Sequence, residues 1–259
     1  MTATIKTNKQ GQELGPKGRS TRQRLMSATE RLLKTSSPVE LTAVSIAKEA
    51  EMSSAAFYLY FEDVRNVLHA LSVAAAAEMA EVHAILAEPW NPQEPDIKHA
   101  MRVVQAFYKV YDKHRAVLRF CNLEADRGDA DFDKIRLGML IPFFEQFSGR
   151  IFEAASENGS RYSRGDAYAE AITLVAALER NASSDPARVQ NAIGTKRLQE
   201  AMARLIAWRF SKDSLTVRKL DSSEAESSSD KESNSASAKT PKKTAKKAVP
   251  LKTPKISSK

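Results

Sequence analysis

The apolar residues of this chain recur at the spacing of an α-helix from Leu25 to Ile206, and this period constrains the fold more than any other feature. Alanine, leucine and long charged residues, which favour helices, dominate the stretch, while glycine and proline are few. No alternation of apolar and polar residues is long enough to predict a sheet. The sequence therefore predicts an all-α protein whose amphipathic helices share buried faces.

The first helix is expected to begin at Ser20, because Gln23 follows three residues later as in a capping box. The run Ser36-Ser37-Pro38 is expected to end it. Its buried stripe, at helical spacing, consists of Leu25, Ala28, Leu32 and Leu33.

Two short helices are predicted next. Thr42 can cap the first of them, and Ser53 can cap the second. Two helices of about two turns, joined by a tight connection and braced by a longer helix, form a helix-turn-helix. The side chains expected in its core are Ile46, Ala47, Ala50, Phe57 and Phe61.

Longer helices are predicted over 62–87, 96–112, 115–126, 131–157, 165–182 and 193–210. Pro142 lies inside one of them, and we expect a kink there. The chain is thereby divided into a flexible basic arm (1–19), a helix-turn-helix domain (20–66), a helical domain (67–212) and a disordered tail (213–259).

The formal net charge of +8 belongs to the tail. Residues 239–259 hold eight lysines and no acid, so residues 1–238 carry 32 basic and 32 acidic side chains and are formally neutral. The high isoelectric point therefore does not describe the folded part. A local positive face is still expected near the N-terminus, because residues 1–34 hold eight basic and two acidic side chains.

Several classes of protein are disfavoured. The N-terminus has no signal peptide, and the longest apolar stretch, Leu71–Ala77, is shorter than the ~20 residues of a membrane span, so we expect a soluble, cytoplasmic protein with no membrane partner. A single cysteine, Cys121, cannot form an internal disulfide. No phosphate loop, nucleophile motif or paired histidine spacing is present, so no enzyme activity, metal or cofactor is expected.

Residues 22–33 (RQRLMSATERLL) and 41–61 (LTAVSIAKEAEMSSAAFYLYF), followed by Glu62-Asp63, resemble the N-terminal part of the TetR family of transcriptional regulators. Two positions depart from the pattern. Glu51 stands where the family usually has a turn glycine, and Val64 where it usually has a lysine, although Arg65 is adjacent. The matching positions are Arg22, Ala28, Thr42, Ile46-Ala47, Tyr58 and Tyr60-Phe61.

The resemblance implies a homodimer that reads a palindromic operator in double-stranded DNA on the nucleoid, acting as a repressor that an effector releases. The third helix would be the recognition helix, since small residues at its start allow close approach to base edges. Hydroxyls and helix N-termini would contact phosphates. The residues expected to contact DNA are Arg22, Thr42, Ser53, Ser54, Ala55, Ala56, Tyr58, Tyr60 and Arg65.

The resemblance also implies an effector-binding and dimerisation domain towards the C-terminus. The dimer would form through 165–182 and 193–210, whose apolar stripes are Ala169, Ile172, Val175 and Ala176, and Leu198, Met202, Leu205 and Ile206. Residues 101–152 are rich in aromatic residues and methionine. These side chains could line an apolar pocket for a small molecule or form ordinary core. The candidate effector contacts are Phe107, Tyr111, Phe120, Met139, Phe143 and Phe147.

Two other functions are compatible with the sequence. One is a non-specific, nucleoid-associated DNA-binding protein driven by the lysine-rich tail. The other is a helical interaction module that does not bind DNA. A sequence preference for DNA separates the first alternative from a regulator, and binding at low salt excludes the second.

Overall fold

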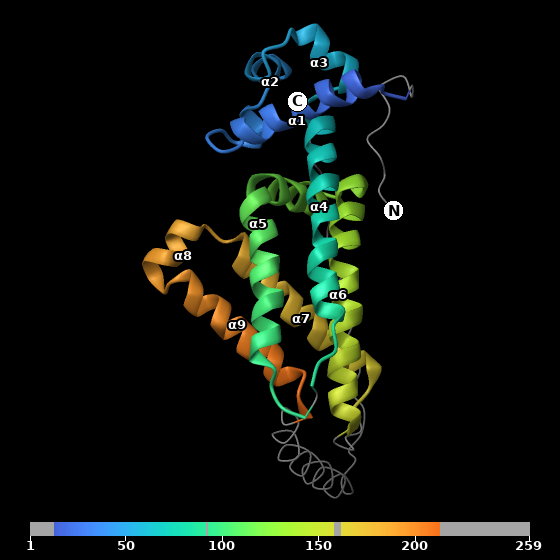
Figure 1. Ribbon diagram of the computed structural model, residues 1–259, viewed down its shortest axis with the longest axis vertical. Helices are drawn as coiled ribbons and strands as arrows, with labels where there is room; N and C mark the ends of the chain where they lie inside the picture. The colour runs from blue at the N-terminus through green and yellow to red at the C-terminus, as the bar shows by residue number, and fades with distance from the viewer. Residues whose placement is uncertain (1–12, 92, 158–161, 213–259) are drawn as a thin grey trace, which may run out of the picture. The chain divides into compact units, whose positions relative to one another are not determined.

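The computed structural model describes residues 13–91, 93–157 and 162–212. The secondary-structure elements in these ranges are helices, as the apolar period predicts (Figure 1). They are α1 (Pro16–Leu32), the 3₁₀ helix η1 (Pro38–Glu40), α2 (Ala43–Glu49), α3 (Ser54–Tyr60), α4 (Val64–Ala87), α5 (Ile97–Asp126), α6 (Ala130–Glu157), α7 (Arg164–Ser183), α8 (Pro186–Ala192) and α9 (Thr195–Arg209).

The first helix begins one turn earlier than predicted. Gly15 is its N-cap and Pro16 its first residue, so Ser20 lies inside the helix and caps nothing. Proline suits this position because its fixed φ is helical and its missing N–H would have no partner there. The prediction of a flexible arm is therefore wrong for residues 16–19, and residues 1–12 and the predicted tail lie outside the described residues.

The helical domain differs from the prediction in two places. The ranges 96–112 and 115–126 form the single helix α5, whose backbone leaves helical geometry only at His114 (φ −116°, ψ 19°). The short helix α8 was not predicted, although Asp185 caps it and Pro186 is its first residue. Helix α6 contains Pro142 in its interior, as predicted, and the kink expected there stays a prediction.

Two large apolar cores share α4. Its first half, with Val67, Leu68 and Leu71, packs with α1–α3 and with Val117 of α5. Its second half, from Ala75 to Leu86, packs with α5, α6, α7 and α9. Helix α4 is long and apolar enough in composition to cross a membrane, but its side chains Val67, Leu68, Leu71, Met79, Val82 and Leu86 are buried in these two cores.

Candidate functional site

The turn between α2 and α3 is a Schellman motif built around a non-glycine residue. Glu51 has a positive φ of 56°, as its place in the family's glycine position predicts. The N–H of Met52 donates to the carbonyl of Ala47 (2.8 Å), and the N–H of Glu51 donates to that of Lys48 (3.0 Å). These bonds satisfy the last carbonyls of α2 and set the direction in which α3 leaves.

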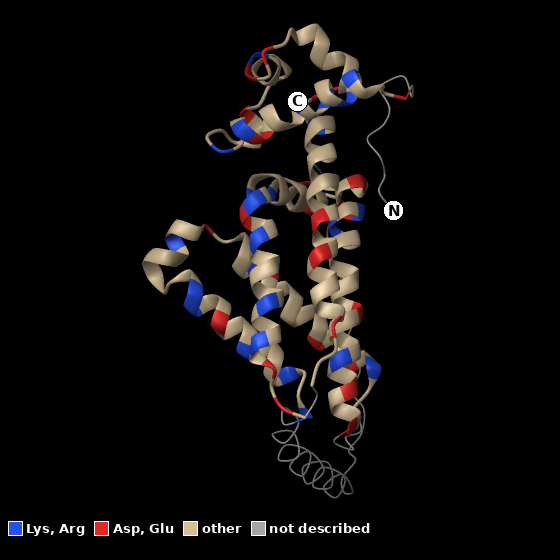
Figure 2. Cartoon of the chain, viewed as in Figure 1, with Lys and Arg blue, Asp and Glu red and all other residues tan. Residues whose placement is uncertain are grey.

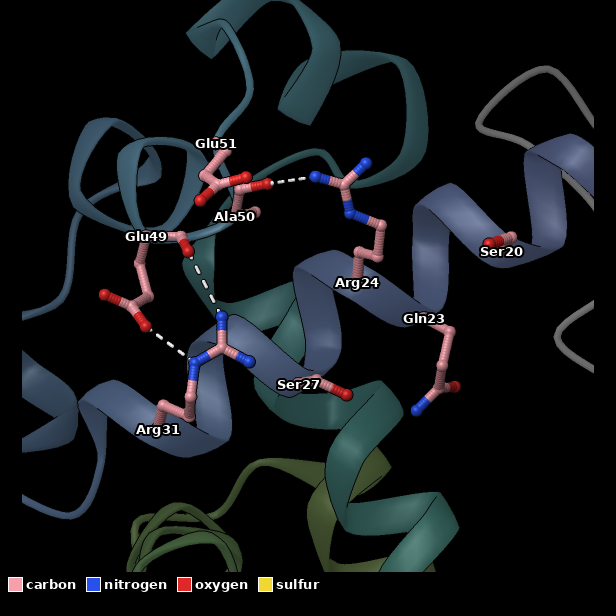
Figure 3. A pocket seen from close by; sticks show the side chains of 8 residues that line it. All are labelled: Ser20, Gln23, Arg24, Ser27, Arg31, Glu49, Ala50 and Glu51. Atoms are coloured by element: carbon pink, nitrogen blue, oxygen red, sulfur yellow. Dashed lines mark hydrogen bonds and ion pairs between the residues drawn. The ribbon is translucent and has the colours of Figure 1, made fainter.

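Two arginines of α1 hold this turn from the other side (Figure 3). Arg24 donates to the carbonyl of Ala50 (2.8 Å), while Arg31 donates to the Glu49 carboxylate (2.6 Å) and carbonyl (3.1 Å). Cations are favourable here, because the carbonyl end of a helix carries partial negative charge. The arginines cross an open polar groove of about 410 Å³, lined also by Ser20, Gln23, Ser27 and Glu51.

Both predicted N-caps are confirmed. Thr42 Oγ1 accepts from the N–H of Ser45 (3.0 Å), and Ser45 Oγ accepts from the N–H of Thr42 (3.0 Å). Ser53 Oγ accepts from the N–H of Ala56 (3.2 Å). Helices of seven residues are too short to be stable alone, so the caps and the core beneath define their ends.

Helix α3 has a buried aromatic side and an uncharged solvent side. Phe57 and the following Phe61 are fully buried, as predicted. Ala55, Tyr58 (50% exposed) and Leu59 (57% exposed) lie on the solvent side, and no charged residue interrupts the helix (Figure 2). Leu59 was missed as a site candidate, although helical spacing from Ala55 places it on that face.

Helix α3 and the N-terminus of α2 therefore bring together Thr42, Ser53, Ser54, Ala55, Ala56 and Tyr58 in one helix-turn-helix, as predicted. Tyr60 differs from Tyr58, because it is half-buried and packs against the core of α1–α4.

Arg22 does not belong to this surface. Its side chain is buried over the ring of Phe61, with the guanidinium 4.7 Å from the ring centroid. It donates to Met26 Sδ (3.1 Å), and burial lowers the pKa of Arg22 to about 10. In this structure Arg22 therefore packs against the core, a position that does not favour its predicted contact with DNA.

Arg65 is also occupied within the chain. It donates to Asp129 (3.0 Å) and Asp131 (3.2 Å) at the start of α6, and its guanidinium lies 5.1 Å from the ring centroid of Phe132. The hydrogen bond to Asp129 raises the pKa of Arg65, and the same bond lowers the pKa of Asp129. Arg65 therefore ties α4 to α6 in this structure, and its contact with a DNA phosphate stays a prediction.

Five of the six effector candidates lie in one aromatic cluster of the large core. Phe107 stacks on Tyr111 at 4.9 Å between centroids and meets Phe143 edge-on at 5.3 Å. Met139 and Phe147 belong to the same core. Phe120 does not, because it packs against Phe132 and Cys121 near the start of α6.

Polar groups are buried beside this cluster. Tyr111 Oη donates to Glu179 of α7 (2.9 Å), and Asn122 donates to the same carboxylate oxygen (2.7 Å). Among the described residues, the hydroxyl of Tyr108 and the side-chain oxygen of Asn122 are buried without a hydrogen-bond partner. Burial raises the pKa of Tyr108 to about 12, so its hydroxyl keeps its proton and can donate to a bound molecule.

The predicted dimer stripes divide between two environments. Val175, Met202 and Ile206 are buried in the core of the single chain. Ile172 (42% exposed) and Leu205 (53% exposed) face solvent, and the exposed apolar surface on α7 and α9 also includes Tyr168 and Trp208. Only the second group is available to a partner.

Other candidate chemistries find little support among the described residues. Cys121 is fully buried, and burial raises the pKa of its thiol to about 11, so it is held as an unreactive thiol. Within the same part of the chain, no group of three His, Cys, Asp or Glu residues is placed to hold a metal ion.

A capped helix-turn-helix followed by a long helical domain is the layout of helical transcription factors. The family described as "Tetracyclin repressor-like, C-terminal domain" matches residues 83–216, just over half of the chain. The protein therefore belongs to the TetR family of transcriptional regulators. No curated protein matches the chain.

Solved structures share the fold at low sequence identity. The fatty acid degradation regulator FadR of Bacillus halodurans is 14% identical with a TM-score of 0.55, over 76% of this chain and 97% of that chain. A TetR-family regulator of Streptomyces coelicolor is 17% identical (TM-score 0.52; 76% and 82% covered). FadR of Bacillus subtilis, solved in complex with stearoyl-CoA, is 11% identical (TM-score 0.54; 71% and 97% covered).

Proposed function

We propose that the protein is a dimeric, sequence-specific DNA-binding repressor that reads the major groove with α3. The observation that carries this proposal is the uncharged, exposed face of α3, presented by a helix whose start is capped and whose other side is anchored by Phe57. Such a face suits a recognition helix, because small and apolar side chains can approach base edges closely and contact thymine methyl groups.

Each residue of that face has a distinct proposed role. Ala55 and Leu59 are suited to the methyl groups of thymine, and Ser54 to a hydrogen bond with a base edge. The N-termini of α2 and α3, at Thr42 and Ser53, are suited to phosphate oxygens, with the Tyr58 and Tyr60 hydroxyls as further donors. Ala56 is close enough to the start of α3 to contact a base as well.

Selection of bound sequences from a random DNA pool tests this assignment. We expect a palindrome whose half-sites are roughly 34–36 Å apart, one turn of DNA. Replacing Leu59 or Ser54 by Asn should change the preferred base, with roughly 1–3 kcal/mol of discrimination per contact. Tyr60→Phe should weaken binding to DNA of every sequence by the same factor. Unchanged preferences in the Leu59 and Ser54 variants would show that another helix reads the operator.

Dimerisation is proposed through the exposed apolar face of α7 and α9. Buried charge without a partner is costly, so Ile172→Asp or Leu205→Glu should give monomers and abolish binding to the palindrome. Ile193→Asp is the matched control, because Ile193 is equally exposed (51%) but lies between α8 and α9. Light scattering measures both, and a monomeric wild type at micromolar concentration contradicts the proposal.

We propose an effector whose apolar part enters the aromatic cluster around Phe107 and Phe143 and whose binding releases DNA. The buried Tyr108 hydroxyl offers its polar part a donor. The stearoyl-CoA bound by a protein of the same fold makes long-chain acyl-CoA the first compound to test. Acyl-CoA should raise the melting temperature and release the operator in wild type, and Phe143→Trp, which adds bulk within the cluster, should weaken both effects.

A further inference from the structure

The helix-turn-helix has few cations available for DNA phosphates. Residues 13–66 carry eight basic and seven acidic side chains. Arg22 is buried, Arg24 and Arg31 bond the end of α2, and Arg65 pairs with Asp129. Arg19 donates to the carbonyl of Leu14 (2.8 Å). The basic side chains of this range with no ion pair or hydrogen bond to a described residue are those of Lys17, Lys34 and Lys48.

This shortage matters because phosphate neutralisation supplies most of the sequence-independent affinity for DNA. Helix α3 itself has no Lys or Arg, so the surface that reads bases adds nothing to that term. An ordinary DNA-binding domain gains this sequence-independent affinity from a basic face. In this chain the excess positive charge lies elsewhere, in the eight lysines of residues 239–259.

We propose that residues 239–259 are a second DNA-binding element, which contacts the phosphates of duplex DNA flanking the operator without reading its sequence. The proposal rests on the proposed DNA-binding function of α3. Lysine suits it, because an ammonium group is a point charge that binds phosphate without demanding a fixed geometry.

The net negative charge of the residues before the tail lysines is too small to neutralise all eight of them. Residues 213–238 hold six acidic and three basic side chains, a net charge of −3. Even if every one of those excess acids paired with a tail lysine, five of the eight lysines would remain for DNA. Neutralising about five phosphates would steepen the dependence of log K on log salt by about 4–5.

The spacing also allows contact. Phe210, directly after α9, meets the ring of Trp90 edge-on at 4.9 Å, and Trp90 follows the C-terminal end of α4. Helix α4 starts at the helix-turn-helix and its 24 residues rise about 36 Å, so Phe210 lies about that far from α3 along the helix. The 26 residues of 213–238 can span at most roughly 90 Å, which exceeds this distance.

The test compares full-length wild type with a variant in which all eight tail lysines are changed to Gln. The matched control changes the same eight residues to Arg, which keeps the charge. Three duplexes are used: the selected operator in about 20 base pairs, the same operator centred in about 60, and 60 base pairs without it. Affinity is measured from 50 to 200 mM salt.

We expect wild type and the Arg variant to lose several hundred-fold more affinity for the long operator duplex over this salt range than the Gln variant loses. On the short duplex the three proteins should lose nearly the same affinity over this salt range. Equal slopes for wild type and the Gln variant on the long duplex would overturn the proposal. A Gln-like slope for the Arg variant would overturn its electrostatic basis, and bridging of two duplexes by wild type would overturn the flanking contact.

Failure of the proposed function gives a different result. If α3 does not read DNA, each of the three proteins binds the long duplex with the operator no more tightly than the long duplex without it. The slope difference between wild type and the Gln variant on those duplexes still decides whether the tail binds DNA.

Discussion

The region of α1–α3 and the helical domain of α4–α9 are stabilised in different ways. Helices α2 and α3 have seven residues each and depend on side-chain caps, a Schellman turn and two arginines of α1. Helices α4–α6 have 24 to 30 residues and depend on a continuous core with many aromatic contacts.

This difference teaches where a single residue matters. In the short helices one buried anchor, a cap or a turn residue decides whether a helix exists, because few hydrogen bonds support it. In the long helices no single terminus decides, and the interior side chains carry the stability. Four substitutions test this contrast.

The largest effect is expected for Phe57→Ala. Phe57 is fully buried under the helix-turn-helix, so the cavity should cost about 3–5 kcal/mol. Hydrogen exchange should then show reduced protection over 43–61 and retained protection over 97–157. Leu59→Ala, two residues away on the exposed face, is the control. An equal loss of stability in both variants would show that burial does not explain the effect.

Ser53→Ala should have an intermediate effect. It removes the acceptor for the Ala56 N–H at the start of α3, at a cost of about 0.5–2 kcal/mol. Ser54→Ala is the control, because Ser54 lies inside the helix and alanine is the better helix former. Urea denaturation measures both, and the contrast between regions fails if the Ser54 variant is the less stable of the two.

Glu51→Gly should stabilise the protein slightly, by up to about 1 kcal/mol. Glycine adopts the positive φ of 56° without strain, and this gain outweighs its greater entropy in the unfolded chain. Lys48→Gly, inside α2, should have the opposite sign and cost about 1 kcal/mol. A lower melting temperature for Glu51→Gly would mean that Glu51 makes a contact beyond its backbone.

Arg65→Gln should have the smallest effect at neutral pH, because the ion pair that it removes is half-exposed. Its pH dependence is diagnostic. Arg65 lowers the pKa of Asp129 in the folded protein, so the pair stabilises above the usual aspartate pKa of about 4, and this stabilisation disappears as pH falls through the lowered value. Melting temperatures of wild type and variant should therefore differ at pH 6 and converge near pH 2. A difference that persists at pH 2 would assign Arg65 to its contact with Phe132.

Much of the fold could be predicted from the sequence. The apolar period predicted the helices, and the caps at Thr42 and Ser53 and the strained turn at Glu51 were predicted to the residue. These features are local, since a cap or a turn depends on atoms within four residues. Pro16, which starts α1, is an equally local signal, but the capping-box pattern at Ser20 pointed to a later start.

Tertiary structure alone decided what each side chain faces. Arg22 and Arg65 look like phosphate ligands in sequence, yet one is buried over Phe61 and the other pairs with Asp129, 64 residues away. The apolar residues of α7 and α9 all recur at helical spacing. Even so, Val175 and Ile206 are buried in the core of the chain, whereas Ile172 and Leu205 are exposed. A helical period defines only a face, and its partner is set by long-range packing, which no local pattern records.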